Sequence, residues 1–234
     1  GTKRRLAPRV AAIVGEMRPG PALDLFAGMC SVGREIAVSR NVWTNDAQHF
    51  ASAFGAAMFT SRPPKLIPGR VWESAQLANI DSDEIAALIK NEAKVLRKAK
   101  LADLQRLHGK LDLFRSLMPT LEERYFPRAY AGTYLGLQQC VDLDAIRNAI
   151  DDIDNASDKR WALIALCASV FRASTSTGHF AQYLRPKEST CKFFIRKRTL
   201  CLFKLWRNYL VGSEPLGNAA WRRGNKAFMG DAVD

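Results

Sequence analysis

The chain has 234 residues, of which 47% are hydrophobic and 25% are charged, a composition that excludes disorder along its whole length. Its longest apolar runs fall short of the roughly 18 residues that a membrane span needs, so no membrane partner is expected. Lysine and arginine outnumber aspartate and glutamate by 35 to 23, and the resulting net charge of +12 favours a polyanionic partner such as nucleic acid.

The first sixty residues predict alternating strands and helices. The run ALDLF is typical of a buried strand, and it is followed by a loop of small residues at 27–33, after which Ser31 is the expected cap of a helix. The order strand, helix, strand, helix is expected over 22–26, 32–40, 42–46 and 47–59. This order predicts the first half of a doubly wound parallel sheet.

The remainder of the chain is predicted to be mostly helical until a last short strand at 225–229. Helical spacing occurs over 81–118 (one long helix or two shorter ones), 141–151, 159–174 and 193–210. We therefore expect an α/β fold in three parts: 1–60 is the first part of the core, 61–222 is a large helical insertion, and 223–234 returns to the sheet. Both ends are expected to be cut from a longer chain.

The cysteines and histidines argue against a metal site. The five cysteines are odd in number and form no C-x-x-C pair, so neither disulfides nor structural zinc is expected and a reducing cytoplasm is favoured. The three histidines are too scattered to suggest a metal site.

The loop that follows the first strand is the most informative block. A glycine loop between a strand and a helix lets the backbone approach a ligand closely. Dinucleotide sites use G-x-G-x-x-G, but the middle position here is Cys30, which leaves less room for a pyrophosphate. Asp24, at the strand tip, would repel a pyrophosphate but could bind the ammonium group of an amino-acid-like ligand.

Asp46 ends the second predicted strand, eighteen positions after Gly28. An acid at this place accepts hydrogen bonds from ribose hydroxyls, so it indicates an adenosyl ligand. The structural alternatives are a helix N-cap at Asp46 and a plain tight turn at the glycine loop.

With these residues in view, DLFAGMCSVG at 24–33 resembles the S-adenosylmethionine loop of amino-methyltransferases, particularly the DNA adenine methylase (Dam-like) family. Four further blocks resemble that family in the same order. They are GTKRRLAP at the start, VWTND, a block in the insertion and Gly-Asp-Ala at 230–232. The insertion block consists of two segments, YLGLQQCVDLDAIRNAI and TSTGHFAQYLRPK. The resemblance spans essentially the whole chain and implies a partial Rossmann-like methyltransferase core with S-adenosylmethionine as its cofactor.

The resemblance also implies roles for individual residues. The cofactor site would comprise Lys3, Asp24, Phe26, Gly28, Asp46 and Asp231. Lys3 would lie near the methionine carboxylate, Asp46 would hold the ribose hydroxyls, and Asp231 would accept a hydrogen bond from the amino group of the cofactor's adenine. Cys30 stands where the family usually has glycine, and it fits if its small side chain faces away from the ligand.

The family performs its reaction with the motif [DN]-P-P-[YFW] at the end of the next strand. There, an acid or amide and a carbonyl accept hydrogen bonds from the target amine, while the ring stacks on the extruded base. The Pro-Pro pair of this chain, Pro63-Pro64, is flanked by Arg62 and Lys65 and lacks both the acceptor and the ring. No catalytic residue is therefore expected within the chain, and the motif is expected beyond Asp234.

Basic residues concentrate between Arg185 and Lys226, a stretch that contains eleven basic and two acidic residues. Some are expected to contact DNA phosphates, and the polar loop that begins at Ser174 is expected to read base edges, although a structural role is the alternative for His179. The expected DNA-binding residues are His179, Gln182, Arg185, Lys187, Arg196, Lys197, Arg198, Arg222 and Arg223. Candidates to support an extruded base are Tyr130, Tyr134, Gln138 and Gln139, whereas Phe194 and Trp206 are expected in the core.

The sequence thus predicts a site-specific methyltransferase that transfers a methyl group from S-adenosylmethionine to the exocyclic amine of adenine in double-stranded DNA. It would be the cytoplasmic modification half of a restriction system, with a cognate restriction endonuclease as partner. The alternatives are an RNA or cytosine-amine methyltransferase on the same scaffold, or a non-catalytic nucleic-acid-binding module with a vestigial cofactor pocket. A nicotinamide dehydrogenase is disfavoured by Asp24, by Cys30 and by the basic insertion.

Overall fold

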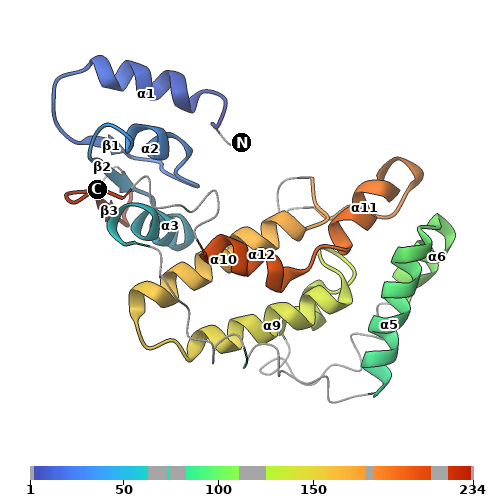
Figure 1. Ribbon diagram of the computed structural model, residues 1–234. Helices are drawn as coiled ribbons and strands as arrows, with labels where there is room; N and C mark the ends of the chain where they lie inside the picture. The colour runs from blue at the N-terminus through green and yellow to red at the C-terminus, as the bar shows by residue number, and fades with distance from the viewer. Residues whose placement is uncertain are drawn as a thin grey trace. The chain divides into compact units, whose positions relative to one another are not determined.

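The computed structural model describes residues 3–62, 73, 83–110, 125–177, 182–211 and 221–232 (Figure 1). The fold is mixed α/β, mostly helical, with a small three-stranded parallel sheet. The chain divides into two compact units. The first comprises Gly1–Leu66, Asn155–Ala165 and Asn208–Asp234, and the second comprises Ile67–Asp154 and Leu166–Arg207.

The sheet belongs to the first unit. Its strands are β1 (Ala22–Asp24), β2 (Val42–Asn45) and β3 (Lys226–Phe228), all close to the predicted positions. Their order is β1-β2-β3 and both pairs are parallel, with Asp24 opposite Thr44 and Asn45 opposite Phe228. The parallel sheet predicted from the alternating elements is therefore present, and its central strand β2 carries Asp46 directly after its end.

Three helices accompany the sheet, namely α1 (Ala7–Glu16), α2 (Ser31–Ile36) and α3 (His49–Thr60). Two glycines allow them to pack closely: a Cβ at Gly33 of α2 would lie 3.3 Å from Phe59 and Val42, and one at Gly55 of α3 would lie 2.5 Å from the Thr44 hydroxyl oxygen. Side chains larger than hydrogen do not fit there without movement, so glycine sets the helix-to-sheet distance.

Two local expectations differ from the structure. Helix α1 was not expected, although its proline in the first turn and the Pro-Gly pair beyond its end are typical boundary signals. The prediction of Ser31 as a side-chain cap is wrong, because α2 begins at Ser31 itself and its N-cap is Cys30, with no side-chain cap hydrogen bond. The Cys30 N–H donates to the Ala27 carbonyl at 2.6 Å, so the chain enters the helix through a tight backbone turn.

The second unit is helical. Its helices are α5 (Asp83–Lys98), α6 (Leu101–His108), α8 (Tyr125–Tyr130), α9 (Leu137–Asp151) and α11 (Cys191–Arg198), the last preceded by the 3₁₀ turn η1 (Glu188–Thr190). Helices α10 (Ala156–Ala173) and α12 (Leu202–Leu210) have residues in both units.

Two of the predicted helical segments are each divided into two helices in the structure, which for 81–118 was one of the two alternatives expected. Within 81–118, α5 and α6 are separated at Ala99, whose φ of +54° no helix can continue, and residues 111–118 lie outside the described part. The single helix predicted over 193–210 is two helices, α11 and α12. Thr199 ends α11, and its hydroxyl donates to the carbonyl of Ile195 at 3.0 Å.

In the described part of the second unit, the core combines apolar packing with a buried ion pair. Leu96 of α5 and Leu104 of α6 pack against Phe194 of α11. Nearby, Arg198 of α11 and Glu92 of α5 lie 3.1 Å apart. A second oxygen of Glu92 accepts the Leu137 N–H at 2.6 Å, which ties the start of α9 to the same carboxylate.

Within the residues described here, no helix combines the length and the apolar character needed to cross a membrane.

Candidate cofactor site and basic surface

Three carboxylates lie at one edge of the sheet. Asp24 is the last residue of β1, Asp46 directly follows β2, and Asp231 follows β3 by three positions. Because the strands are parallel, their carboxyl ends meet at the same edge. This edge is where ligands bind in open α/β sheets.

The glycine loop is fixed against the end of β2 by two hydrogen bonds. The Ala27 N–H donates to the Asn45 carbonyl at 3.1 Å, and the Gly28 N–H donates to Oδ2 of Asp46 at 2.9 Å. Gly28 has a φ of +48°, which favours glycine, and a Cβ built there meets nothing within 4 Å. The loop therefore presents open backbone at its glycine, as an approach to a ligand requires.

The Asp46 carboxylate orders the site with both of its oxygens. Oδ2 accepts from Gly28, and Oδ1 accepts from the N–H of Gln48, the N-cap residue of α3, at 2.9 Å. Asp46 thus organises the helix start, which was the structural alternative for this residue. An ionised carboxylate oxygen accepts two hydrogen bonds, so each oxygen retains capacity for a ribose hydroxyl.

Asp24 is half-buried, and burial raises the pKa of its carboxyl group. Hydrogen bonds from the backbone N–H groups of Phe26 and Gly33 act in the opposite direction, whereas the charge of Asp46 adds to the increase. Two acidic side chains that lie close together favour a cation between them. The acidic side chains at this edge would therefore attract an ammonium group and repel a pyrophosphate.

The end of β3 is joined to the end of β2 through Asn45. Its side-chain N–H donates to the Gly230 carbonyl at 3.0 Å, which places the chain leading to Asp231 beside the residue that precedes Asp46. Asn45 is buried and was not singled out from the sequence. Its position at a strand end, next to a candidate ligand-binding acid, was the available signal.

Two other predicted cofactor residues are exposed, and the structure gives them different surroundings. Phe26 has 79% of its surface exposed and lies two residues after the end of β1. Lys3 precedes α1, and its carbonyl accepts the N–H groups of Leu6 and Ala7 at 2.9 Å. The structure thus gives the Lys3 backbone a role in starting α1.

Cys30 has its side chain inside the fold. The residue is 1% exposed, and burial raises the pKa of its thiol well above the usual range, so it remains protonated. Its φ of +54° is one that glycine adopts more readily. The buried thiol therefore faces away from the exposed side of the loop.

The predicted DNA-binding residues fall into different classes. Exposed side chains are those of Gln182, Arg185, Lys187, Arg196 and Arg223. Lys197 and Arg222 are instead bound to helix ends: Lys197 donates to the Arg172 carbonyl at 2.5 Å, and Arg222 donates to the carbonyls of Ala37 and Val38. These two side chains satisfy carbonyls that a helix terminus leaves open. His179 lies outside the described residues.

The assignment of Arg198 to DNA contact is wrong. Its side chain is 2% exposed and is held by Glu92, so it cannot reach a phosphate at the surface. Burial raises the pKa of Glu92 and lowers that of Arg198, while the charge of each partner opposes the other's shift. The signal in the sequence was the spacing of Ile85, Ile89, Glu92 and Leu96, which puts one acid on the apolar stripe of α5.

The candidates for supporting a base are also divided. Gln139 is buried and donates to the carbonyls of Lys197 and Leu200 at 2.9 and 2.8 Å, so it is structural. Gln138 is exposed and donates to Asp142 at 2.7 Å, and the rings of Tyr130 and Tyr134 contact each other edge to face. Phe194 and Trp206 are buried, which confirms the prediction that they belong to the core.

In the part of the chain that the structure describes, no group of three or more histidine, cysteine or acidic side chains is arranged to hold a metal ion. All five cysteines are free.

Comparisons of the chain with protein-family models, with curated proteins and with solved structures found no match. The fold and the site themselves define a mixed α/β protein with an acid-lined glycine loop at the carboxyl edge of a parallel sheet.

Proposed function

We propose that the chain is the cofactor-binding and DNA-recognition part of an S-adenosylmethionine-dependent methyltransferase that acts on the exocyclic amine of adenine in DNA. The observation that carries this proposal is the bond from the Gly28 N–H to the Asp46 carboxylate, which joins the glycine loop to the end of β2 beside a second acid, Asp24. In this proposal the sheet and its helices are a partial Rossmann-like core.

The residues present suit such a cofactor. Asp24 would bind the amino group of the methionine moiety, Asp46 would hold the ribose hydroxyls, and Asp231 would accept from the adenine amino group. The open backbone at Gly28 leaves room for the ligand between them. When bound, the cofactor supplies an activated methyl group, and the task of this chain is to bind and orient it in line with the target amine.

In this proposal, the [DN]-P-P-[YFW] motif that positions the target amine lies at the end of a further parallel strand. Among the described strands, β1 pairs only with β2, so its other edge is open to such a strand. Leu23, Leu25 and Phe26 are 54%, 41% and 79% exposed, respectively, although strands of parallel sheets are ordinarily covered. A strand on this edge would end next to the glycine loop.

Binding to this chain separates the proposal from its alternatives. Titration calorimetry should detect S-adenosylhomocysteine but not NAD at the same concentration, because the two acids at the sheet edge oppose a pyrophosphate. NAD binding of equal or greater strength would favour a dehydrogenase instead. Absence of binding by either ligand would favour the nucleic-acid-binding module with a vestigial pocket.

The target amine and the biological setting are further parts of the proposal. RNA and cytosine-amine methyltransferases would use the same cofactor residues, so competition between DNA and RNA substrates distinguishes them. Cytoplasmic location and a cognate restriction endonuclease are proposed on the resemblance alone.

A further inference from the structure

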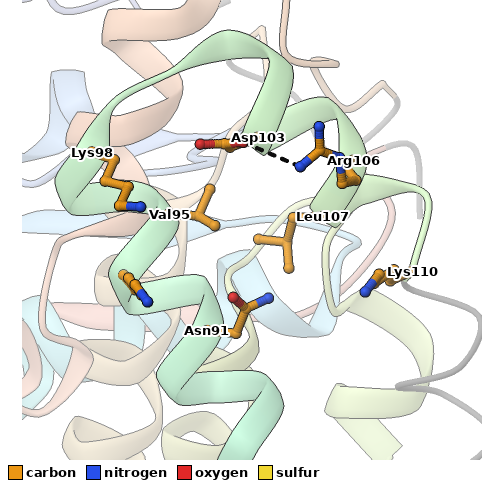
Figure 2. A pocket seen from close by; sticks show the side chains of 8 residues that line it. Asn91, Val95, Lys98, Asp103, Arg106, Leu107 and Lys110 are labelled. Atoms are coloured by element: carbon orange, nitrogen blue, oxygen red, sulfur yellow. Dashed lines mark ion pairs between the residues drawn. The ribbon is translucent and has the colours of Figure 1, made fainter.

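The helical hairpin of α5 and α6 encloses a basic hollow of about 250 Å³ that the proposed function does not use (Figure 2). Asn91, Lys94, Val95 and Lys98 line it from α5, while Asp103, Arg106, Leu107 and Lys110 line it from α6 and the turn that follows. Figure 2 shows the Val95 and Leu107 side chains between the two helices and the charged groups around them. The hollow therefore has an apolar floor and a charged rim.

The rim carries four cations and one carboxylate. Asp103 lies 3.5 Å from Arg106, so the single acid is engaged with one of the four cations. The Lys94, Lys98 and Lys110 side chains are exposed around the same hollow. Such an excess of positive charge over a small space favours an anion.

The hairpin is held in place by its packing against α11. Leu96 and Leu104 pack against Phe194 of α11, and Val95, Cys191 and Ile195 extend this contact. The Gln105 side chain donates to the Pro186 carbonyl at 3.3 Å, which brings the segment with Arg185 and Lys187 to α6. Two basic segments far apart in the sequence are thus adjacent within one unit.

We propose that the α5–α6 hollow binds a backbone phosphate of the nucleic acid, so that the hairpin is a DNA-contacting surface beyond the basic segment 185–226. A volume of about 250 Å³ is below the ~300–1,000 Å³ of ordinary ligand pockets, which fits a phosphate group better than a whole cofactor. The identification of the polyanion as DNA rests on the proposed function. The inference that the hollow binds a phosphate group does not depend on that function.

Polymeric phosphate is favoured over free phosphate by the exposure of the lysines. A single exposed ion pair contributes little binding free energy, so one small anion would be held weakly. A nucleic acid gains binding free energy from each cation that displaces a condensed counterion, and this gain adds over several contacts. Exposed lysines around a small hollow are consequently suited to the phosphate backbone of a nucleic acid, which other basic residues of the chain also bind.

The test compares two double variants of α5 that lose the same charge. Lys94→Gln with Lys98→Gln removes cations from the rim, and Lys90→Gln with Arg97→Gln removes two exposed cations that do not line the hollow. Binding of a fluorescent mixed-sequence DNA duplex to the whole chain is measured by anisotropy over a series of salt concentrations. The rim variant should bind at least about fivefold more weakly at low salt, and the magnitude of its slope against log salt should fall by about 1 because one phosphate contact is lost, while the control variant stays near wild type.

Equal losses in the two variants, or wild-type binding by both, would overturn the proposal, as would a wild-type chain that binds no DNA. Displacement of the duplex by inorganic phosphate at constant ionic strength would also overturn it, in favour of a free-anion site. Titration of the rim variant with S-adenosylhomocysteine tests the cofactor site separately. A rim-dependent loss of DNA binding in a chain that does not bind the cofactor would sustain this inference while the proposed methyltransferase function failed.

Discussion

At the scale of single residues, environment decides what each acid of this chain does. Asp46 is held by two backbone N–H groups, one at each oxygen, and so serves the glycine loop and α3 together. Asp142 is also held, by Gln138, but desolvation dominates and raises the pKa of its carboxyl group to about 6. The Asp46 carboxylate is thus engaged by donors at both oxygens, whereas burial disfavours the charged form of the Asp142 carboxyl group.

The raised pKa of Asp142 gives a prediction for stability against pH. Because the folded pKa of about 6 exceeds the ordinary 3.8, the folded state binds the proton more tightly, and stability should fall as the pH rises from about 4 to above 6. Asp142→Asn retains an oxygen for the Gln138 N–H and carries no charge. At pH 7 we expect this variant to be more stable than wild type by about 1–3 kcal/mol, with the difference vanishing below pH 4.

Urea unfolding at pH 4 to 8 measures this effect. Asp152→Asn, an exposed acid at the end of the same helix, is the control and should reproduce the wild-type profile. An Asp142→Asn advantage that is constant over the whole pH range would show that the carboxyl charge is not responsible.

At the scale of elements, α5, α9 and α11 are joined through the Glu92–Arg198 pair. Glu92 accepts from Arg198 and from the Leu137 N–H at the start of α9, and the Arg198 guanidinium also donates to the Thr133 carbonyl at 3.2 Å. A buried pair of this kind is weak evidence of net stabilisation, but each partner needs the other. Removing one charge of the pair should therefore weaken the packing of all three helices against one another.

We expect Arg198→Ala to lower the free energy of unfolding by about 3–5 kcal/mol, because it leaves the Glu92 carboxylate buried without a cation. Arg196→Ala, on the exposed side of the same helix, should change it by less than about 0.5 kcal/mol. Denaturant unfolding of both variants at neutral pH checks this. A loss below about 1 kcal/mol for Arg198→Ala would mean that the ion pair does not hold the helices.

The sequence predicted elements better than their ends. The strands were recoverable because each is a short apolar run near turn residues, and the sheet edge followed because parallel strands end together. The break between two helices at Thr199 could not be predicted, since the charged and apolar residues over 193–210 maintain helical spacing across it. Arg198 was misplaced for the same reason: a run of three basic residues indicates a solvated face, and only the distant Glu92 shows otherwise.

At the scale of the whole molecule, the proposed cofactor site and the basic hollow lie in different compact units. The first contains the sheet edge with Asp24, Asp46 and Asp231, and the second contains the basic hollow of the α5–α6 hairpin. We therefore expect cofactor binding and DNA binding to respond to different substitutions. The cofactor site is the central claim, since a basic surface alone would also suit a simple nucleic-acid-binding module.

The most direct test of that claim is a calorimetric titration of S-adenosylhomocysteine into the wild-type chain and into Asp46→Ala. Loss of a charged hydrogen-bonding partner should weaken binding by about ten- to a hundredfold, while Glu35→Ala, an exposed acid on α2, should bind like wild type. Asp46→Asn, which retains one acceptor oxygen, should fall between Asp46→Ala and wild type. Undetectable binding by the wild-type chain, or equal binding by Asp46→Ala, would contradict the account.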